Sequence, residues 1–190
     1  DQEFLDEVSK ASPDLVIFDQ LDTDNGYLEK LKQLSADTKI ITFEDQGSGA
    51  ELADLVISDL YPNKNINQQK QLTGIENAVL APSFETLDRQ RKTPEQVSEI
   101  VVLFGGTDPS ELALKALSAL QHIDFDGKVK VIRGLGATEI TQEFNLDIEF
   151  LSNVKNMPRV LSRADIALSR AGRTITELAS LGVPTICMAQ

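Results

Sequence analysis

The sequence predicts an α/β protein built from two parallel-sheet units, and two observations lead to this fold class. Short runs of β-branched and other apolar residues alternate along the chain with stretches that have helical spacing. This alternation is typical of parallel sheets with right-handed crossovers. A polar stretch at 86–99 interrupts the alternation, which then starts again. We therefore expect a first domain at 1–88, a linker at 89–98 and a second domain at 99–190.

The first domain opens on a helix-like stretch and continues mainly in strands. The run Asp14–Asp19 follows a proline and is apolar, as expected of a strand that is covered on both faces. Leucines and a tyrosine at helical spacing predict a helix over 26–34. The remaining strands of this domain are expected at Lys39–Phe43, Leu55–Ser58 and Asn77–Ala81.

The second domain repeats the strand–helix order. Strands are expected at Glu99–Phe104, Lys128–Arg133, Asp147–Leu151, Ala164–Ser169 and Pro184–Met188. Helices are expected at Pro109–Gln121, 137–144, 157–163 and 173–181. Neither domain has the strands of a complete doubly wound sheet, and both chain ends lie in regular elements. We therefore expect the chain to be a fragment, truncated at both ends.

The composition excludes several classes of protein. The 190 residues include 18 Lys+Arg and 30 Asp+Glu, a net charge of −12, which argues against a general nucleic-acid binder. No apolar run approaches the roughly 20 residues of a membrane span, and we expect a cytoplasmic protein. A single cysteine, Cys187, and a single histidine, His122, argue against a disulfide scaffold or a transition-metal site. We expect His122 at the surface, Cys187 buried, and no cofactor.

The charge is unevenly distributed. Residues 1–95 contain 9 basic and 19 acidic side chains, whereas residues 96–190 contain 9 and 11. Four arginines lie close together near the end of the chain: Arg159, Arg163, Arg170 and Arg173. An anionic ligand is therefore expected to bind the second half. The alternative, that Arg159 and Arg163 are solvated helix surface, stays open.

The first candidate site is a Gly-Gly turn directly after the first strand of the second domain. Gly105 and Gly106 permit a tight turn and a close approach of the backbone to a ligand. Thr107 or Asp108 can cap the following helix, and Pro109 suits its first turn. The exposed amides would then form an anion site. A plain strand-to-helix turn is the alternative.

The second candidate site also lies between a strand and a helix, over 169–177. Gly172 and the amides of Arg173 and Thr174 would hold a diphosphate, and the arginine would add a charge-assisted contact. Glu177 lies about one turn further on, where its carboxylate would accept hydrogen bonds from ribose hydroxyls. The alternative is a helix start resembling a capping box, with a solvated glutamate.

These residues carry a resemblance. The segment Ala164–Pro184 resembles the nucleotide-binding segment of MurG-type GT-B glycosyltransferases. It is more similar still to the PseG/SpsG-like UDP-sugar hydrolases of pseudaminic acid biosynthesis, which share the Gly172–Glu177 interval. MurG-type segments usually have one more residue there. Collinear matches run through the rest of the chain: Asp14–Asp19, Ala53–Val56, Pro82–Phe84, Phe104–Asp108, Leu114–Leu117 and Asn156–Met157.

The resemblance implies a GT-B-like fold of two Rossmann-like units that binds UDP or a UDP-sugar. It implies that the Phe150–Met157 loop holds the base through its backbone, that the glycine turns hold the diphosphate and that Glu177 holds the ribose. The nucleotide-binding residues expected on this basis are Gly105, Gly106, Thr107, Asp108, Val154, Asn156, Met157, Ser169, Gly172, Arg173, Thr174 and Glu177.

The chain also departs from the hydrolase pattern. Nothing matches the general-base histidine of that family, so no catalytic residue is assigned. Ala171 and Arg173 stand where the family usually has a glycine and a small hydroxyl residue. Further departures are Gln20-Leu21, Leu87-Asp88 and an Asn-Gln motif expected beyond Gln190.

Three functions follow for the parent protein. The preferred one is hydrolysis of a UDP-linked amino-sugar, in which a base activates water and helix N-termini stabilise the leaving diphosphate. The second is a UDP-sugar-dependent glycosyltransferase of GT-B fold, which uses the same cleft with a sugar acceptor in place of water. The third is a non-catalytic domain that binds nucleotide-sugars or serves as a scaffold. The fragment itself is expected to be inactive.

Overall fold

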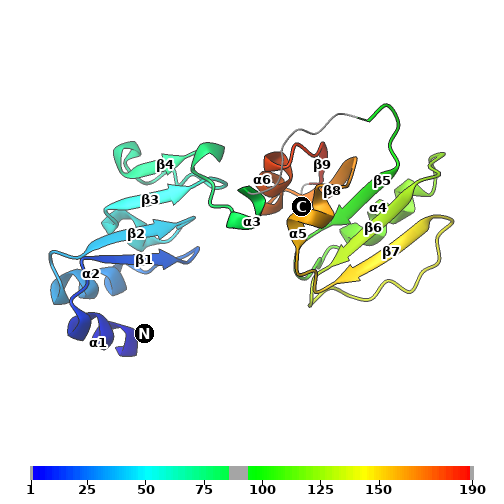
Figure 1. Ribbon diagram of the computed structural model, residues 1–190. Coiled ribbons are helices and arrows are strands. Elements are labelled where there is room, and N and C mark those ends of the chain that lie inside the picture. The colour runs from blue at the N-terminus through cyan, green and yellow to red at the C-terminus, as the bar shows by residue number, and fades with distance from the viewer. Residues whose placement is uncertain (1, 86–93, 189–190) are drawn as a thin grey trace. The chain divides into compact units, whose positions relative to one another are not determined.

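The computed structural model describes residues 2–85 and 94–188, which form two compact α/β units, Asp1–Val79 and Leu80–Gln190 (Figure 1). The boundary between the units lies earlier than the expected end of the first domain at 88. The reason is that Leu80 and Phe84 pack into the core of the second unit, which therefore includes the helix α3 (Pro82–Glu85). The part of the expected linker at 89–93 lies outside the described residues.

The first unit has a parallel sheet with the strand order β1-β2-β3-β4. Its elements are α1 (Gln2–Ala11), β1 (Leu15–Asp19), α2 (Asn25–Leu34), β2 (Lys39–Phe43), η1 (Ser48–Leu52), β3 (Leu55–Ser58), η2 (Gln68–Lys70), β4 (Gln71–Thr73) and η3 (Ile75–Asn77). The strand expected at Asn77–Ala81 is wrong. Gly74, with φ +101°, turns the chain into η3, and Val79 is left exposed.

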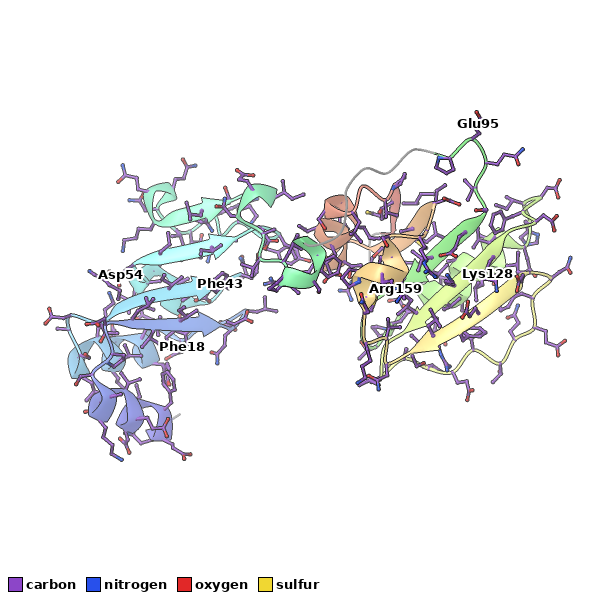
Figure 2. All side chains as sticks on the ribbon, viewed as in Figure 1. Phe18, Phe43, Asp54, Glu95, Lys128 and Arg159 are labelled. Atoms are coloured by element: carbon purple, nitrogen blue, oxygen red, sulfur yellow. The ribbon has the colours of Figure 1, made fainter. Side chains whose placement is uncertain are left out.

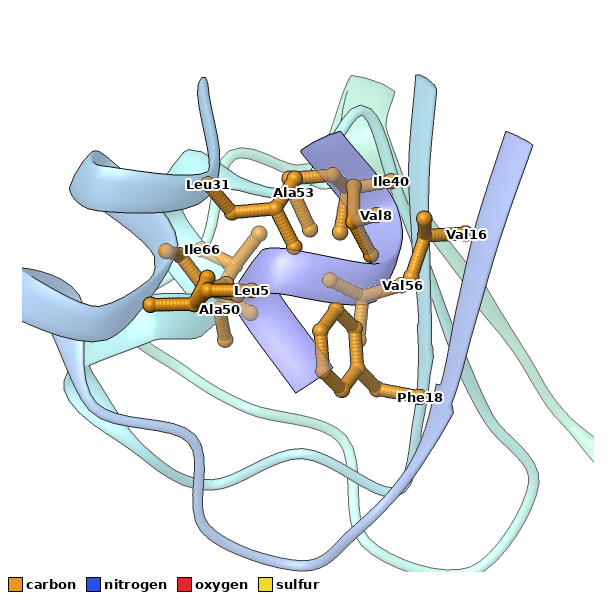
Figure 3. Close-up of a cluster of buried hydrophobic side chains, with 11 residues drawn as sticks. Leu5, Val8, Val16, Phe18, Leu31, Ile40, Ala50, Ala53, Val56 and Ile66 are labelled. Atoms are coloured by element: carbon orange, nitrogen blue, oxygen red, sulfur yellow. The ribbon is translucent and has the colours of Figure 1, made fainter. Parts of the chain in front are cut away.

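One face of the first sheet carries the core of this unit. Side chains of α1 and α2 pack on alternate residues of the strands, including Val16, Phe18 and Ile40 (Figure 3). Both helices lie on the same side of the sheet (Figure 1). Leu15 and Ile17 point to the other face and are 44% and 57% exposed. Within the described residues, β1 is therefore covered on one face only, contrary to expectation.

The second unit has a parallel sheet with the strand order β7-β6-β5-β8-β9. Its remaining elements are β5 (Glu99–Leu103), α4 (Leu112–Leu120), β6 (Lys128–Arg133), β7 (Asp147–Ser152), α5 (Met157–Leu161), β8 (Ile166–Arg170), α6 (Arg173–Ser180) and β9 (Thr185–Met188). The chain adds strands first on one side of β5 and then on the other. The switch point of a doubly wound sheet, where such folds bind ligands, thus lies between β5 and β8.

Helices cover both faces of the second sheet. Ile100 and Val102 of β5 pack with α4, whereas the alternating Val101 and Leu103 pack with residues of α3, α5 and α6. This arrangement places α4 and α6 on opposite faces, although each follows a strand that ends at the switch point.

Several expectations for the second unit need correction. No helix forms over 137–144, because Ile140, Phe144 and Leu146 all pack against the core on the α4 side along an irregular segment. The helix expected at Pro109–Gln121 begins only at Leu112. Cys187 is exposed, because β9 pairs only with β8 within the described residues. His122 is exposed, as expected.

In residues 2–85 and 94–188, no helix has both the length and the apolar character needed to cross a bilayer.

Candidate functional site

The two glycine turns predicted from the sequence meet at one edge of the second sheet. Leu103, the last residue of β5, pairs with Ser169 of β8, so the two strands end side by side. The Gly105–Gly106 turn follows the first strand and Gly172 follows the second. The structure therefore brings both turns to the switch point, where parallel sheets bind their ligands.

The first turn is built around Gly105, whose φ of +88° favours glycine. The Asp108 carboxylate accepts hydrogen bonds from the N–H groups of Leu112 and Ala113, both at 2.9 Å, so its side chain caps α4 as predicted. It does so from four residues upstream, because the N-cap position is Glu111, and Pro109 lies before the helix rather than in its first turn. The first-turn amides of α4 are thus occupied by a carboxylate of the chain itself. A Cβ atom at Gly105 or Gly106 would meet nothing within 4 Å, so the turn itself is open to a ligand.

The second turn differs because nothing caps the helix that follows it. Gly172 is the N-cap residue of α6 and has no side chain to accept hydrogen bonds from the first-turn N–H groups. Within the described residues, no side chain caps the start of α6, and a Cβ atom at Gly172 would also meet nothing within 4 Å. The positive end of the helix dipole therefore lies next to an unfilled position in the described part of the chain. Of the two helix starts, α6 is the one that is free to bind an anion.

Glu177 lies one turn into α6 and is half-buried. Burial raises the pKa of its carboxyl group. Among the residues that the structure describes, no hydrogen-bond donor contacts this carboxylate. Ser169, by contrast, is buried, and its hydroxyl donates to the carbonyl of Arg170 at 3.2 Å. Glu177 therefore keeps its acceptor capacity for a ligand, while the Ser169 hydroxyl is used within the fold.

The loop expected to hold the base lies further along the same edge. β7 is separated from β5 by β6, which places its end about 10 Å from the first turn. Asn156 caps α5, because its Oδ1 accepts from the N–H of Arg159 at 3.1 Å, and Val154 and Met157 pack against the core. Val154 and Asn156 also line a groove of about 390 Å³. Arg159, which is labelled in Figure 2, lines the same groove. The other residues of this groove are Lys130, Glu149, Leu151, Arg159, Val160 and Arg163.

A cavity that the sequence interpretation missed adjoins the first glycine turn. It has a volume of about 280 Å³ and lies between the segments 104–114 and 132–142. The signal that could have revealed it is a third glycine-bearing turn, Gly134 and Gly136, directly after β6. No group of three or more His, Cys, Asp and Glu side chains in the described ranges is placed to hold a metal ion.

A two-unit α/β fold with glycine turns at a switch point is typical of proteins that bind nucleotides, and comparisons with known proteins narrow the fold class. Residues 100–189 match the Glycosyltransferase family 28 C-terminal domain. The chain is 24% identical to the spore coat polysaccharide biosynthesis protein SpsG of Bacillus subtilis, over 98% of this chain and 58% of SpsG. It is 33% identical to a transferase of Caldicellulosiruptor saccharolyticus named for UDP-N-acetylglucosamine, over 60% of this chain and 34% of the transferase.

Among solved structures, MurG of Acinetobacter baumannii superposes with a TM-score of 0.62 at 18% identity, covering 98% of this chain and 55% of MurG. The fold is therefore GT-B-like, as expected. In sequence, the chain is similar to SpsG and, in its second unit, to the C-terminal domain of family 28 glycosyltransferases. The chain spans about half the length of the curated relatives it matches along nearly its whole length.

Proposed function

We propose that the second unit binds the UDP part of a UDP-sugar, within a GT-B glycosyltransferase that transfers the sugar to an acceptor. The observation that carries the proposal is that two open glycine turns meet at the switch point. The second turn leads directly into the start of α6, which has no side-chain cap, and Glu177 lies one turn further along this helix. Helix N-termini with free N–H groups are the usual diphosphate sites of parallel-sheet proteins. The relative named for UDP-N-acetylglucosamine supports the choice of nucleotide.

The charges around the second turn fit this ligand. Arg170 and Arg173 flank Gly172 and are both exposed, so their side chains are free to turn toward a bound diphosphate. A diphosphate bound there would gain the α6 dipole together with charge-assisted hydrogen bonds. The start of α4, already capped by Asp108, offers no comparable site.

Glu177 is the proposed ribose-binding residue. A half-buried carboxylate without a donor is under-solvated, and two ribose hydroxyls would supply the missing hydrogen bonds. The carboxylate must be ionised to accept both. Because burial raises the pKa of Glu177, its contribution to nucleoside binding should grow as the pH rises through that raised value.

The test is calorimetry with UDP and with uridine, on the wild type, Glu177→Ala and Glu177→Gln. We expect Glu177→Ala to weaken both ligands about tenfold, as loss of a charge-assisted hydrogen bond does. Uridine has no phosphate to titrate, so its affinity for the wild type should rise as the pH rises through the raised pKa of Glu177. With Glu177→Gln that pH dependence should vanish. Equal affinities in all three proteins would refute the ribose role.

A second candidate function is hydrolysis of the UDP-sugar, which the Gly172–Glu177 interval and the similarity to SpsG favour. Incubation of the full-length parent protein with UDP-N-acetylglucosamine distinguishes the two. Sugar release without an acceptor indicates a hydrolase, whereas turnover only with an acceptor indicates a transferase. UDP binding without any turnover indicates a non-catalytic binding domain.

A further inference from the structure

We infer that the 280 Å³ cavity beside the first glycine turn is a subsite for a single pyranose ring. The inference rests on the proposed function, since the ring is either the sugar of the bound UDP-sugar or a separate saccharide unit beside it. The cavity shares Gly105 and Asp108 with the predicted nucleotide site. Its other walls belong to α4 and to the irregular segment 134–142, which the sequence interpretation did not include.

The size of the cavity suits one ring. Pockets for drug-sized ligands begin at about 300 Å³. At about 280 Å³ this cavity is too small for a whole nucleotide-sugar but large enough for a single pyranose. Its apolar lining on the α4 side comes from the buried Phe104 and from Leu114 of α4, whereas the side chain of Ile132 packs on the opposite face of the sheet. Such a lining suits the C–H face of a sugar ring.

The rim supplies polar groups for the ring hydroxyls. Arg133 is the central one: its guanidinium stacks over Phe150, 5.5 Å from the ring centroid, and its buried Nε has no hydrogen-bond acceptor among the residues that the structure describes. A buried donor without a partner costs about 1–3 kcal/mol, which a ligand oxygen would recover. The other polar groups on the rim are the side chains of Glu111, Thr138, Glu139, Thr141 and Gln142.

The charge of the cavity selects among ligands. Among the described residues that line the cavity, Arg133 is the one basic side chain, against the carboxylates of Asp108, Glu111 and Glu139. Asp108 is already satisfied by two backbone N–H groups, but the net charge remains negative. This charge disfavours a phosphate or carboxylate ligand and favours a neutral polyol or an amino-sugar. The subsite is therefore chemically distinct from the diphosphate site at α6.

The cavity is also fixed to the predicted nucleotide site. The N–H of Gly136 donates to the carbonyl of Gly106 at 3.0 Å, so the segment that forms one wall is held against the first glycine turn. Because β5 and β8 end side by side, a saccharide in the cavity would lie on the far side of the first glycine turn from the proposed diphosphate site at α6. One ligand that occupies both sites must therefore extend across this turn.

The experiment compares UDP, UDP-N-acetylglucosamine and the methyl glycoside of N-acetylglucosamine on the wild type and four variants. Arg133→Met removes the donor but keeps an apolar chain over Phe150, and Leu114→Trp fills the cavity. Gln142→Ala alters an exposed rim residue with little risk to folding. Lys115→Met, an exposed cation on α4 outside the cavity, is the matched control. Thermal unfolding checks that each variant is folded.

We expect Arg133→Met and Leu114→Trp to bind the saccharide ligand about tenfold more weakly, Gln142→Ala a few-fold more weakly, and Lys115→Met as the wild type does. UDP affinity should be unchanged in all four. Loss of the extra affinity of UDP-N-acetylglucosamine over UDP assigns the ring to the nucleotide-sugar. Binding of the methyl glycoside is measured by the NMR shifts of the backbone amides of 138–142. If the variants lose only this binding, the cavity holds a separate saccharide and not the sugar of the nucleotide-sugar.

The inference is overturned if UDP-N-acetylglucosamine binds no better than UDP and the methyl glycoside leaves the amides of 138–142 unshifted. It is also overturned if Arg133→Met and Leu114→Trp bind both saccharide ligands as the wild type does. Failure of UDP itself to bind would instead refute the proposed function. The methyl glycoside alone would then decide the subsite.

Discussion

Gly134→Ala is expected to destabilise the second unit by about 3 kcal/mol and to reduce UDP affinity at least tenfold. A Cβ atom at this position would lie 2.2 Å from the carbonyl oxygen of Gly106, 2.3 Å from its Cα and 2.4 Å from its carbonyl carbon. All three are backbone atoms, so no flexible side chain can move aside. One of the two turns must shift, and the first turn carries the predicted diphosphate contacts.

Gly136→Ala is the matched control. The nearest atoms to its added Cβ would be Cγ2 of Thr107 at 3.1 Å and the Gly106 oxygen at 3.5 Å, so a small side-chain movement is enough. Its own N–H would keep the hydrogen bond to Gly106. Circular dichroism melts should therefore show a transition more than about 10 °C lower for Gly134→Ala only. Similar melting curves for the two variants would contradict the packing argument.

The strands that the sequence predicted well are those with buried apolar runs. β2, β3 and β6 begin and end where their apolar or alternating pattern does, because each strand has neighbours on both edges. β4 escaped prediction because Gln71–Thr73 is a short polar strand that pairs with β3 alone. Three residues show no periodicity, and only the register with β3 defines the strand. The segment Asn77–Ala81 is more apolar and therefore predicts a strand there instead.

The candidate site was predicted in part for a similar reason. Glycines after strands mark turns in the sequence, so the turns at Gly105 and Gly172 were found. The two turns meet because β5 and β8 are neighbours in the sheet. This strand order cannot be predicted from a local sequence pattern. The cap formed by Asp108 follows local rules and was predicted, whereas the unpaired Nε of Arg133 depends on packing across β6 and β7. Cys187 was misjudged because burial in a strand depends on its position in the sheet.

A second large effect is expected in the first unit, at two adjacent buried acids that follow β2. Oδ1 of Asp45 accepts from the N–H groups of Thr23 at 3.0 Å and Gly47 at 2.9 Å, and Oδ2 accepts from the Thr23 hydroxyl at 2.5 Å. Asp45→Ala would leave these donors buried without partners. At about 1–3 kcal/mol for each unsatisfied group, we expect a loss of about 3 kcal/mol or more.

Asp45→Asn should restore most of this stability. The amide oxygen can accept from both N–H groups as Oδ1 does, and the amide nitrogen can donate to the Thr23 hydroxyl, which is both donor and acceptor. Urea unfolding followed by tyrosine fluorescence is a selective measurement. The chain has no tryptophan, and both tyrosines, Tyr27 and Tyr61, lie in the first unit. Equal losses for Asn and Ala would show that the charge, not the hydrogen-bond geometry, is required.

The same change from carboxylate to amide at the neighbouring Glu44, Glu44→Gln, should destabilise the protein, in contrast to Asp45→Asn. Its Oε1 accepts from the N–H groups of Asp59 and Leu60 and its Oε2 from that of Tyr61, so a glutamine would place a donor against a donor. Burial by itself would raise the pKa of Glu44, but a hydrogen bond with the Asp59 side chain and these three N–H groups lower it overall.

A lowered pKa in the folded state means that Glu44 stabilises the protein above its ordinary pKa, and that this stabilisation is lost as the pH falls through the lowered value. Glu44→Gln should therefore cost about 2 kcal/mol at neutral pH and less in acid, whereas Asp45→Asn costs little at neutral pH. The same urea series at pH 7 and pH 3 checks both. A Glu44→Gln protein as stable as the wild type at pH 7 would contradict the donor–donor conflict. Adjacent buried carboxylates can thus differ in whether they need charge or only acceptor geometry, and their donors decide which.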